Sequence, residues 1–281
     1  MLKRILTSLV AIAVLLPVLY FSDTVVFPIA VSVVGLISLY EMFKCIGFER
    51  RWSVILPIYL FSAILPFAMR YLHMQSAVNF GKLVFIVAAL YLVYLFARVV
   101  WSHGTLTFSD AAVCFTLSLY IIAALSSILY VRDYGESGKY IYLLIFIGAW
   151  VTDIFAYFTG FFFGKHKLIE DVSPKKTIEG SIGGIIFCSL GFVALGLIVD
   201  VFFGQDANLI FLAVSGVVIS IISQIGDLIM SVIKRHYQIK DFGKLFPGHG
   251  GMLDRFDSIM AVSLGLCAVC MFASIMGISL M

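Results

Sequence analysis

The residues with the clearest chemical character lie in one polar stretch, Ser231 to Asp257, between two apolar segments. Its cations are Lys234, Arg235, Lys240, Lys244 and Arg255, and its loop glycines are Gly248, Gly250 and Gly251. Lys and Arg side chains bind phosphates, and glycines let backbone N–H groups close on an anion. The stretch therefore predicts a polyphosphate-binding site, because a purely structural loop would not need this combination.

Three aspartates accompany these cations. Asp254 and Asp257 are three residues apart, which places them on one face of a helix, and Asp227 ends the preceding apolar segment. Carboxylate oxygens suit Mg²⁺, which binds proteins through one or two carboxylates plus substrate phosphates. Asp254 and Asp257 are therefore predicted metal ligands. For His249, a structural hydrogen bond and a substrate contact remain alternatives.

A second polar element runs from Ser173 to Gly180 and reads S-P-K-K-T-I-E-G. Lys175, Lys176 and Thr177 offer two cations and a hydroxyl, a set that can hold phosphate. The structural alternative is that Ser173 N-caps a helix with Pro174 at its first position.

An unusual acid, Asp153, lies deep in apolar sequence and is followed by Tyr157, Gly160 and Gly164 on the same helix face. An acid at this depth faces a protein interior or a wet cavity, and the glycines allow another helix to approach closely. Asp153 and Asp227 are therefore expected to border one cavity, with Asp153 and Tyr157 near the substrate. The alternative is a packing face in which Asp153 meets a structural partner.

The elements that must position these residues are membrane-spanning helices. Of the 281 residues, 62% are hydrophobic and only 12% are charged, against about 25% charged in soluble domains. Nine segments approach the length of about 20 apolar residues that a span needs. They are 5–21, 24–43, 54–69, 83–101, 111–131, 140–163, 182–203, 209–233 and 259–280. The sequence predicts an all-α polytopic membrane protein with a single domain, 1–281.

Charge placement predicts the orientation. If the N-terminus is cytoplasmic, cytoplasmic segments hold fifteen of the nineteen Lys and Arg residues, as the positive-inside rule favours. Both polar elements then face the cytoplasm. The net charge of +3 is too small to predict nucleic-acid binding.

These motifs resemble one known family. Ser231 to Asp257 is similar to the signature S-x-x-K-R-x4-K-D-x-G-x3-P-G-H-G-G-x2-D-R-x-D of the CDP-diacylglycerol synthases, or phosphatidate cytidylyltransferases. Ser173 to Gly180 and the D-x3-Y-x2-G-x3-G run from Asp153 resemble the family's other hallmarks. The resemblance covers residues 140–281, the expected catalytic helices and loops, whereas the five spans in 1–139 match only in hydrophobicity.

The resemblance implies transfer of CMP from CTP to phosphatidate, giving CDP-diacylglycerol and pyrophosphate for phospholipid synthesis. It implies a Mg²⁺ requirement, a second cation, a homodimer, and a site facing the cytoplasm at a bacterial inner membrane. The implied catalytic residues are Asp227, Asp254, Lys234, Arg235 and Arg255. The implied metal ligands are Asp227, Asp254 and Asp257, with the inner-sphere set left open. The implied substrate contacts are Lys175, Lys176, Thr177, Lys240, Lys244, His249, Gly250, Gly251, Asp153 and Tyr157.

Two other classes of protein fit less well. A CDP-alcohol phosphotransferase would carry D-G-x2-A-R followed by spaced aspartates, which this sequence lacks. A secondary transporter would fit the spans and the intramembrane acids, but such proteins often contain internal repeats, and the sequence shows no convincing self-similarity.

Overall fold

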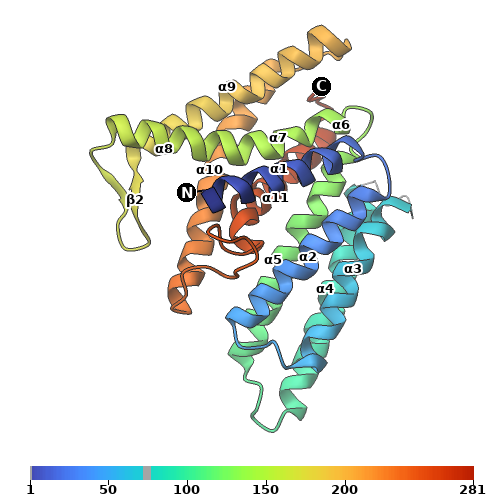
Figure 1. Cartoon of the computed structure of the whole chain (residues 1–281). Coiled ribbons are helices and arrows are strands. Elements are labelled where there is room, and N and C mark those ends of the chain that lie inside the picture. Colours follow the sequence, from blue (N-terminus) through green and yellow to red (C-terminus); the bar gives the residue numbers. More distant parts are fainter. Residues whose placement is uncertain (1, 72–76) are drawn as a thin grey trace. The chain divides into compact units, whose positions relative to one another are not determined.

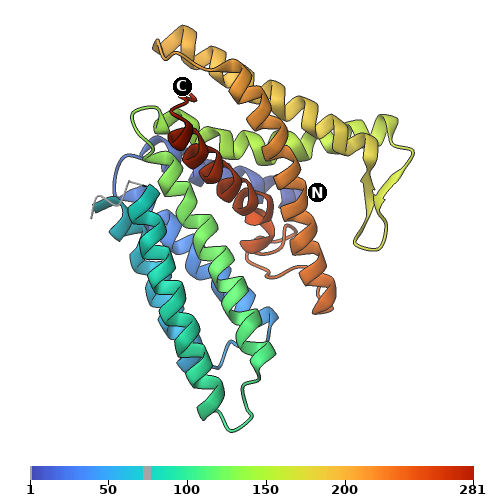
Figure 2. The same cartoon turned by 180° about the vertical axis from the view of Figure 1, so that it is seen from behind.

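The computed structural model describes residues 2–71 and 77–281, and it is built of helices apart from one short hairpin (Figures 1 and 2). The helices are α1 (Leu2–Tyr20), α2 (Val26–Cys45), α3 (Trp52–Tyr71), α4 (Ala77–Trp101), α5 (Phe108–Arg132), α6 (Gly138–Ile141), α7 (Leu143–Phe146), the π-helical η1 (Ile147–Val151), α8 (Thr152–Phe163), α9 (Ile178–Phe203), α10 (Leu209–His236) and α11 (Leu253–Met276). The hairpin pairs β1 (Lys167–Ile169) with β2 (Ser173–Thr177). The predicted all-α class is confirmed.

Within the described residues, eight helices are long and apolar enough to cross a membrane. One of them, Gly138–Phe163, is the run from α6 through η1 to α8. The first of the nine predicted spans corresponds to α1, in which Leu9–Tyr20 forms a shorter apolar stretch. The chain is therefore a polytopic membrane protein with eight candidate spans and one shorter apolar helix in its described part.

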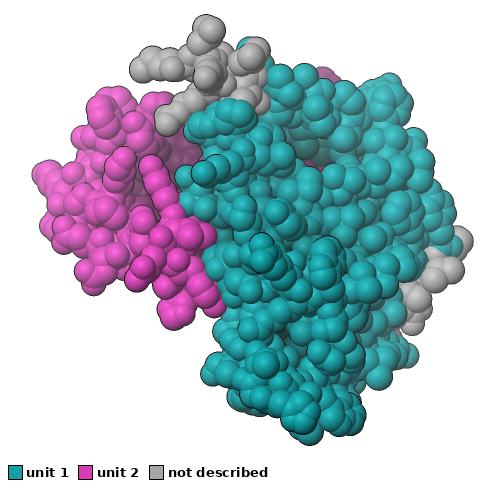
Figure 3. Space-filling model, turned by 60° about the horizontal axis from the view of Figure 1, so that its bottom comes forward, with its two compact units in different colours: residues 1–129, 241–254 teal, residues 130–240, 255–281 magenta. Residues whose placement is uncertain are grey.

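The chain folds as two compact units, coloured separately in Figure 3. The first comprises residues 1–129 and 241–254, and the second comprises residues 130–240 and 255–281. The polar stretch from Ser231 to Asp257 is thus shared between the units. Its part with Gly248, Gly250 and Gly251, which we call the glycine loop, belongs to the same unit as the N-terminal helices.

The first unit is organised by the packing of α2 along α3. The Ser32 hydroxyl donates to the Ala63 carbonyl at 3.0 Å, and a Cβ at Gly35 would lie 2.7 Å from the Ser62 hydroxyl oxygen. Small and hydroxylated residues therefore let these two apolar helices approach closely, as in other membrane helix pairs.

The second unit is organised by α9, which packs along both α8 and α10. A Cβ at Gly160 would lie 2.7 Å from Thr177 Oγ1 and 3.6 Å from the Cα of Gly180. At Gly164 a Cβ would meet Thr177 Cγ2 at 2.8 Å. The prediction of close helix approach is confirmed at Gly160, whereas Gly164 lies just beyond the end of α8 and contacts Thr177, the last residue of β2.

The second polar element, Ser173 to Gly180, begins with a strand. Its structural alternative, a helix capped by Ser173, is wrong. Ser173 to Thr177 is β2, and α9 begins only at Ile178. The N-cap is Thr177, whose backbone is extended and whose Oγ1 accepts the N–H of Gly180 at 3.1 Å. Ser173 is therefore not the helix cap, because the antiparallel pairing with β1 keeps it extended.

Candidate functional site

The second unit brings three of the predicted site aspartates together, each from a different helix. Asp153 of α8 interacts electrostatically with Asp227 of α10. Asp257 of α11 interacts with both of them. Asp153, Asp227 and Asp257 thus lie within electrostatic range of one another, while the cavity that Asp153 and Asp227 were expected to border stays a prediction. We call Asp153, Asp227 and Asp257 the acidic cluster.

Glycine and serine residues place these carboxylates. A Cβ at Gly226 would overlap the methyl group of Ala261, so α10 and α11 touch one residue before Asp227. Ser258 lies between the other two acids: its hydroxyl donates to Asp153 Oδ2 at 3.4 Å, and its backbone N–H donates to Asp257 Oδ1 at 2.9 Å. The cluster is therefore supported by direct helix contact and by hydrogen bonds.

A π-helical turn immediately precedes Asp153. The η1 segment, Ile147–Val151, leads directly into α8 at Thr152. A π-helical turn holds an additional residue, which changes the direction in which the side chains after it point, and such turns are frequent at functional sites. The sequence pattern alone, read with a uniform α-helical period, gave no indication of this turn.

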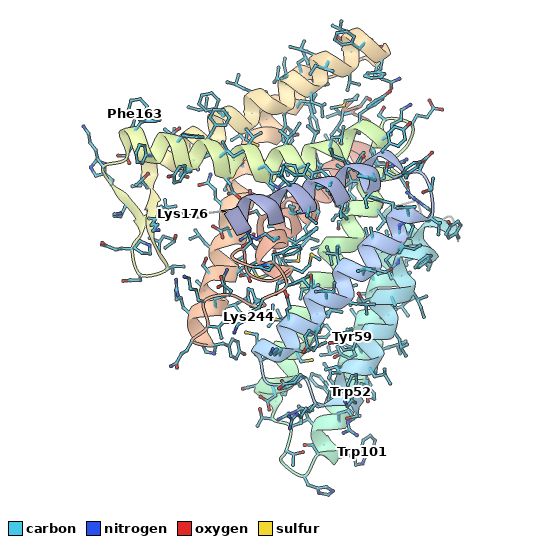
Figure 4. The ribbon with its side chains drawn as sticks, viewed as in Figure 1. Trp52, Tyr59, Trp101, Phe163, Lys176 and Lys244 are labelled. Carbon is cyan, nitrogen blue, oxygen red and sulfur yellow. The ribbon has the colours of Figure 1, made fainter. Side chains whose placement is uncertain are left out.

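Three cations lie near the acidic cluster. The Lys176 ammonium lies 2.5 Å from Asp227 Oδ2, with both side chains about a quarter exposed; Lys176 is labelled on β2 in Figure 4. Lys234 interacts electrostatically with Asp257, and Arg255 interacts with Asp153. Each carboxylate thus has a cationic neighbour, and two predicted phosphate-binding side chains, Lys176 and Lys234, lie beside predicted metal ligands.

The donor set of the acidic cluster fits a Mg²⁺ ion that also uses substrate oxygens. Among residues 2–71 and 77–281, no three His, Cys, Asp or Glu side chains are grouped so that they could hold a metal ion by themselves. Mg²⁺ does not require such a group, because it commonly takes one or two carboxylates together with substrate phosphates and water. Asp227 and Asp257 provide two hard carboxylates of this kind.

The glycine loop belongs to the first unit and contains a tight turn. His249 donates its backbone N–H to the Phe246 carbonyl at 2.9 Å, and Phe246 donates to the Gly250 carbonyl at 2.9 Å. Gly248 follows Pro247 with a φ of 83°, as the third residue of a type II turn requires. The P-G-H-G sequence is therefore explained in part by the shape of the backbone.

Asp254 closes this loop onto the start of α11. It is 6% exposed, and its Oδ2 accepts the backbone N–H groups of Phe242 at 2.8 Å and Gly251 at 3.0 Å. The geometry gives Asp254 a loop-holding function. Its role as a metal ligand stays a prediction, as does the role of Gly250 and Gly251 in binding substrate.

The other predicted contacts lie at accessible positions. Arg235 and Lys240, together with Gln238 and Ile239, line an open cavity of about 300 Å³ in the second unit. Lys175 and Lys244 are exposed, and His249 is half-buried. Tyr157 is 67% exposed and stacks on Phe161 with ring centroids 6.3 Å apart. Substrate binding by these residues stays a prediction.

Sequence reasoning missed Glu41 of α2. It is 5% exposed, and it accepts the backbone N–H groups of Met252 at 3.0 Å and Leu253 at 2.8 Å. Glu41 is the only charged residue in the expected span 24–43. An acid within a span is costly and usually functional. The reasoning that made Asp153 a candidate site residue therefore applies equally to Glu41.

Gly226→Ala is expected to lower enzymatic turnover by at least ~10-fold. The added methyl group would overlap Ala261 and force α10 and α11 apart beside Asp227, and displacements of about 1 Å near a site can cost as much as ~100-fold in rate. The control is Gly81→Ala in α4, where the described residues leave open space around the added Cβ. Equal turnover of the two variants would contradict the close approach of α10 and α11.

The fold and the acidic cluster define a polytopic membrane protein with grouped carboxylates and neighbouring cations. The chain belongs to the cytidylyltransferase family, whose sequence profile matches residues 2–273. A phosphatidate cytidylyltransferase of Staphylococcus aureus (strain COL) is 36% identical over 261 residues, which cover 92% of this chain and 95% of that protein. The phosphatidate cytidylyltransferase of Staphylococcus haemolyticus is 35% identical over 267 residues, with the same coverage. The similarity therefore extends well beyond residues 140–281, to which sequence reasoning had confined it.

Proposed function

We propose that this protein is a phosphatidate cytidylyltransferase, which transfers CMP from CTP to phosphatidate and releases pyrophosphate. The observation that carries the proposal is the match, over nearly the whole chain, to relatives named for this activity. The acidic cluster with its three cations is the structural feature that supports it.

The proposed reaction joins two anions. A phosphate oxygen of phosphatidate forms a bond to the α-phosphorus of CTP, while the bond from that phosphorus to the oxygen bridging to the β-phosphorus breaks. The attacking oxygen already carries negative charge, so it needs no general base. The main obstacle is repulsion between the phosphates. Lys176, Lys234 and Arg255 reduce this repulsion and stabilise the departing pyrophosphate.

Asp227 and Asp257 would hold the Mg²⁺ ion, and Asp153 would lie beside them or help to hold a second cation. A bound metal would supply positive charge that offsets the negative charge developing during transfer. Without a cation between them, three facing carboxylates would repel the substrate phosphates. The ion pair of Asp227 with Lys176 supports this arrangement, because it keeps a phosphate-binding cation at the metal-binding acid.

The open cavity lined by Arg235 and Lys240 is the proposed site for the distal phosphates of CTP. Arg presents a planar set of donors that matches phosphate oxygens, and Lys provides a compact charge. The acyl chains of phosphatidate would stay in the bilayer while its headgroup meets CTP at the polar level. Association as a homodimer is proposed from the family resemblance alone.

The polar loops are proposed to face the cytoplasm at a bacterial inner membrane. Six candidate spans separate the end of α2 from the α10–α11 loop. An even number returns the chain to the same side, which agrees with the contact between Glu41, near the end of α2, and Leu253. Four spans separate the end of α2 from the β1–β2 hairpin, so the hairpin falls on that side too. The excess of basic residues there supports a cytoplasmic location.

Single-cysteine labelling tests this orientation. On a background without native cysteines, cysteines placed at positions 175 and 249 are expected to resist a membrane-impermeant reagent in sealed cells and to react after permeabilisation. A cysteine at position 206, in the α9–α10 connection, is expected to react from outside. Labelling of positions 175 and 249 from outside would contradict the proposed orientation.

The activity itself is tested with purified protein in mixed micelles of detergent and phosphatidate. With CTP and Mg²⁺ present, the expected product is a nucleotide that partitions into organic solvent. Product formation must require both substrates. Absence of such a product from a folded, monodisperse preparation would overturn the proposed function.

A further inference from the structure

The strongest unassigned feature of the described residues is a buried carboxylate in the half of the chain that carries none of the motif residues. Glu41 lies in α2, four residues before the helix ends at Cys45, and its side chain is almost completely inaccessible. Both of its oxygens are used: Oε1 accepts the Met252 N–H at 3.0 Å, and Oε2 accepts the Leu253 N–H at 2.8 Å. A buried charge of this kind is retained only where it is well paired.

The glycine loop is shaped to receive this carboxylate. At Gly251, an added Cβ would overlap the carboxyl group of Glu41, and its three nearest heavy atoms would all belong to Glu41. At Gly243, an added Cβ would likewise overlap Glu41. Both glycines therefore provide the space that allows Glu41 to reach the loop backbone.

The loop amides close on the protein's own carboxylates. The N–H of Gly251 donates to Asp254, and those of Met252 and Leu253 donate to Glu41. N–H groups at a helix N-terminus have no intrahelical partner and attract anions. Glu41 occupies this position at the start of α11. We call Glu41 and Asp254, which together accept four backbone N–H groups of the loop, the loop clamp.

We propose that Glu41 is a positioning residue for nucleotidyl transfer, which acts by fixing the 242–253 loop so that Lys244 is presented to CTP. This inference rests on the proposed function. It assigns a role to a residue of the N-terminal helices, which the family profile also covers. Because Glu41 and Asp254 already accept the backbone N–H groups of the loop, substrate phosphates would contact its side chains.

The test combines a structural readout with a kinetic one. Glu41→Gln keeps the size of the side chain but removes its charge, and it replaces one acceptor oxygen by an NH₂ group that faces a backbone N–H. The loop should therefore loosen. Trypsin cleavage of the Lys244–Leu245 bond, followed by mass spectrometry without substrates, is expected to accelerate at least ~10-fold. Lys244 is exposed and labelled in Figure 4.

The kinetic readout separates positioning from a merely structural role. In Glu41→Gln, kcat/KM for CTP is expected to fall by ~30- to 100-fold, mainly through a higher KM. The midpoint of thermal unfolding should stay close to that of the unmodified protein. Glu49→Gln is the matched control, because Glu49 is an exposed glutamate of the same unit. It should change neither cleavage nor kinetics.

Gly251→Ala provides a second route to the same test if Glu41→Gln fails to accumulate. It changes no charge, yet its methyl group would displace the Glu41 carboxylate, so cleavage after Lys244 should accelerate as well. Unchanged cleavage in an accumulating variant would overturn the clamp, and faster cleavage with an unchanged KM for CTP would overturn the positioning role. If the unmodified protein had no transfer activity, the proposed function would fail, while the cleavage rates would still decide whether Glu41 holds the loop.

Discussion

Asp227→Asn is expected to lower cytidylyl transfer by more than ~100-fold, the loss that removal of an outer partner of a metal ligand alone can cause. The substitution removes a carboxylate that pairs with Lys176 at 2.5 Å and interacts with both other acids of the cluster. The variant should insert and extract normally, because losing one of three mutually repelling charges offsets the loss of the ion pair. Turnover at saturating CTP, measured over a series of Mg²⁺ concentrations, checks this prediction.

Asp200→Asn is the matched control, since Asp200 is a half-buried aspartate near the end of α9. It should retain normal turnover. The turnover of Asp153→Asn should lie between those of Asp227→Asn and Asp200→Asn, because Asp153 lies beside the proposed metal ligands and is expected to shape the cavity. Near-normal activity of Asp227→Asn at limiting Mg²⁺ would show that the acidic cluster does not hold the metal.

Asp254→Asn is also expected to abolish transfer while the protein still inserts in the membrane. Its Oδ2 holds two backbone N–H groups of the glycine loop. An amide oxygen can accept the same bonds, but the negative charge is lost. If Asp254 is also a metal ligand, the Mg²⁺ concentration for half-maximal rate should rise in any residual activity. If it only holds the loop, that concentration should not change.

The comparison for this variant is Asp23→Asn, an exposed aspartate of the same unit. It should leave both turnover and Mg²⁺ dependence unaltered. Asp254→Asn with close to full turnover at limiting Mg²⁺ would refute the assignment of Asp254 to the metal site. Trypsin cleavage after Lys244 would then show whether the loop still depends on its carboxylate.

Much of the architecture could be predicted because hydrocarbon imposes a simple rule on the backbone. Long apolar segments must be helical in a membrane, so hydropathy predicted the spans. The main difference is α1, which was predicted as a full span and contains only a shorter apolar stretch. The acids at Asp153 and Asp227 were detectable because charge is rare in such segments. Both were expected to lie toward the same side of the membrane, but only the fold shows that they interact within the second unit.

Other features depend on contacts that no local pattern encodes. The β1–β2 hairpin was missed because S-P-K-K-T contains a plausible helix start, and its pairing partner Lys167–Ile169 is short. The hydrogen bonds by which Asp254 holds the loop were not predicted, because its position in the motif indicated a metal ligand instead. Glu41 itself was detectable as a charge within a span, but its partners Met252 and Leu253 were not, because they lie about 210 residues further along the chain.

The position of isotopic label in the lipid product tests the central claim most directly. Purified protein receives phosphatidate and Mg²⁺ with CTP labelled either at the α-phosphorus or at the γ-phosphorus, and Asp227→Asn serves as the blank. Cytidylyl transfer predicts that α-label enters the organic phase and γ-label stays in water as pyrophosphate, in equal molar amounts. Label from the γ-position in the lipid, or no lipid label from either position, would contradict the account.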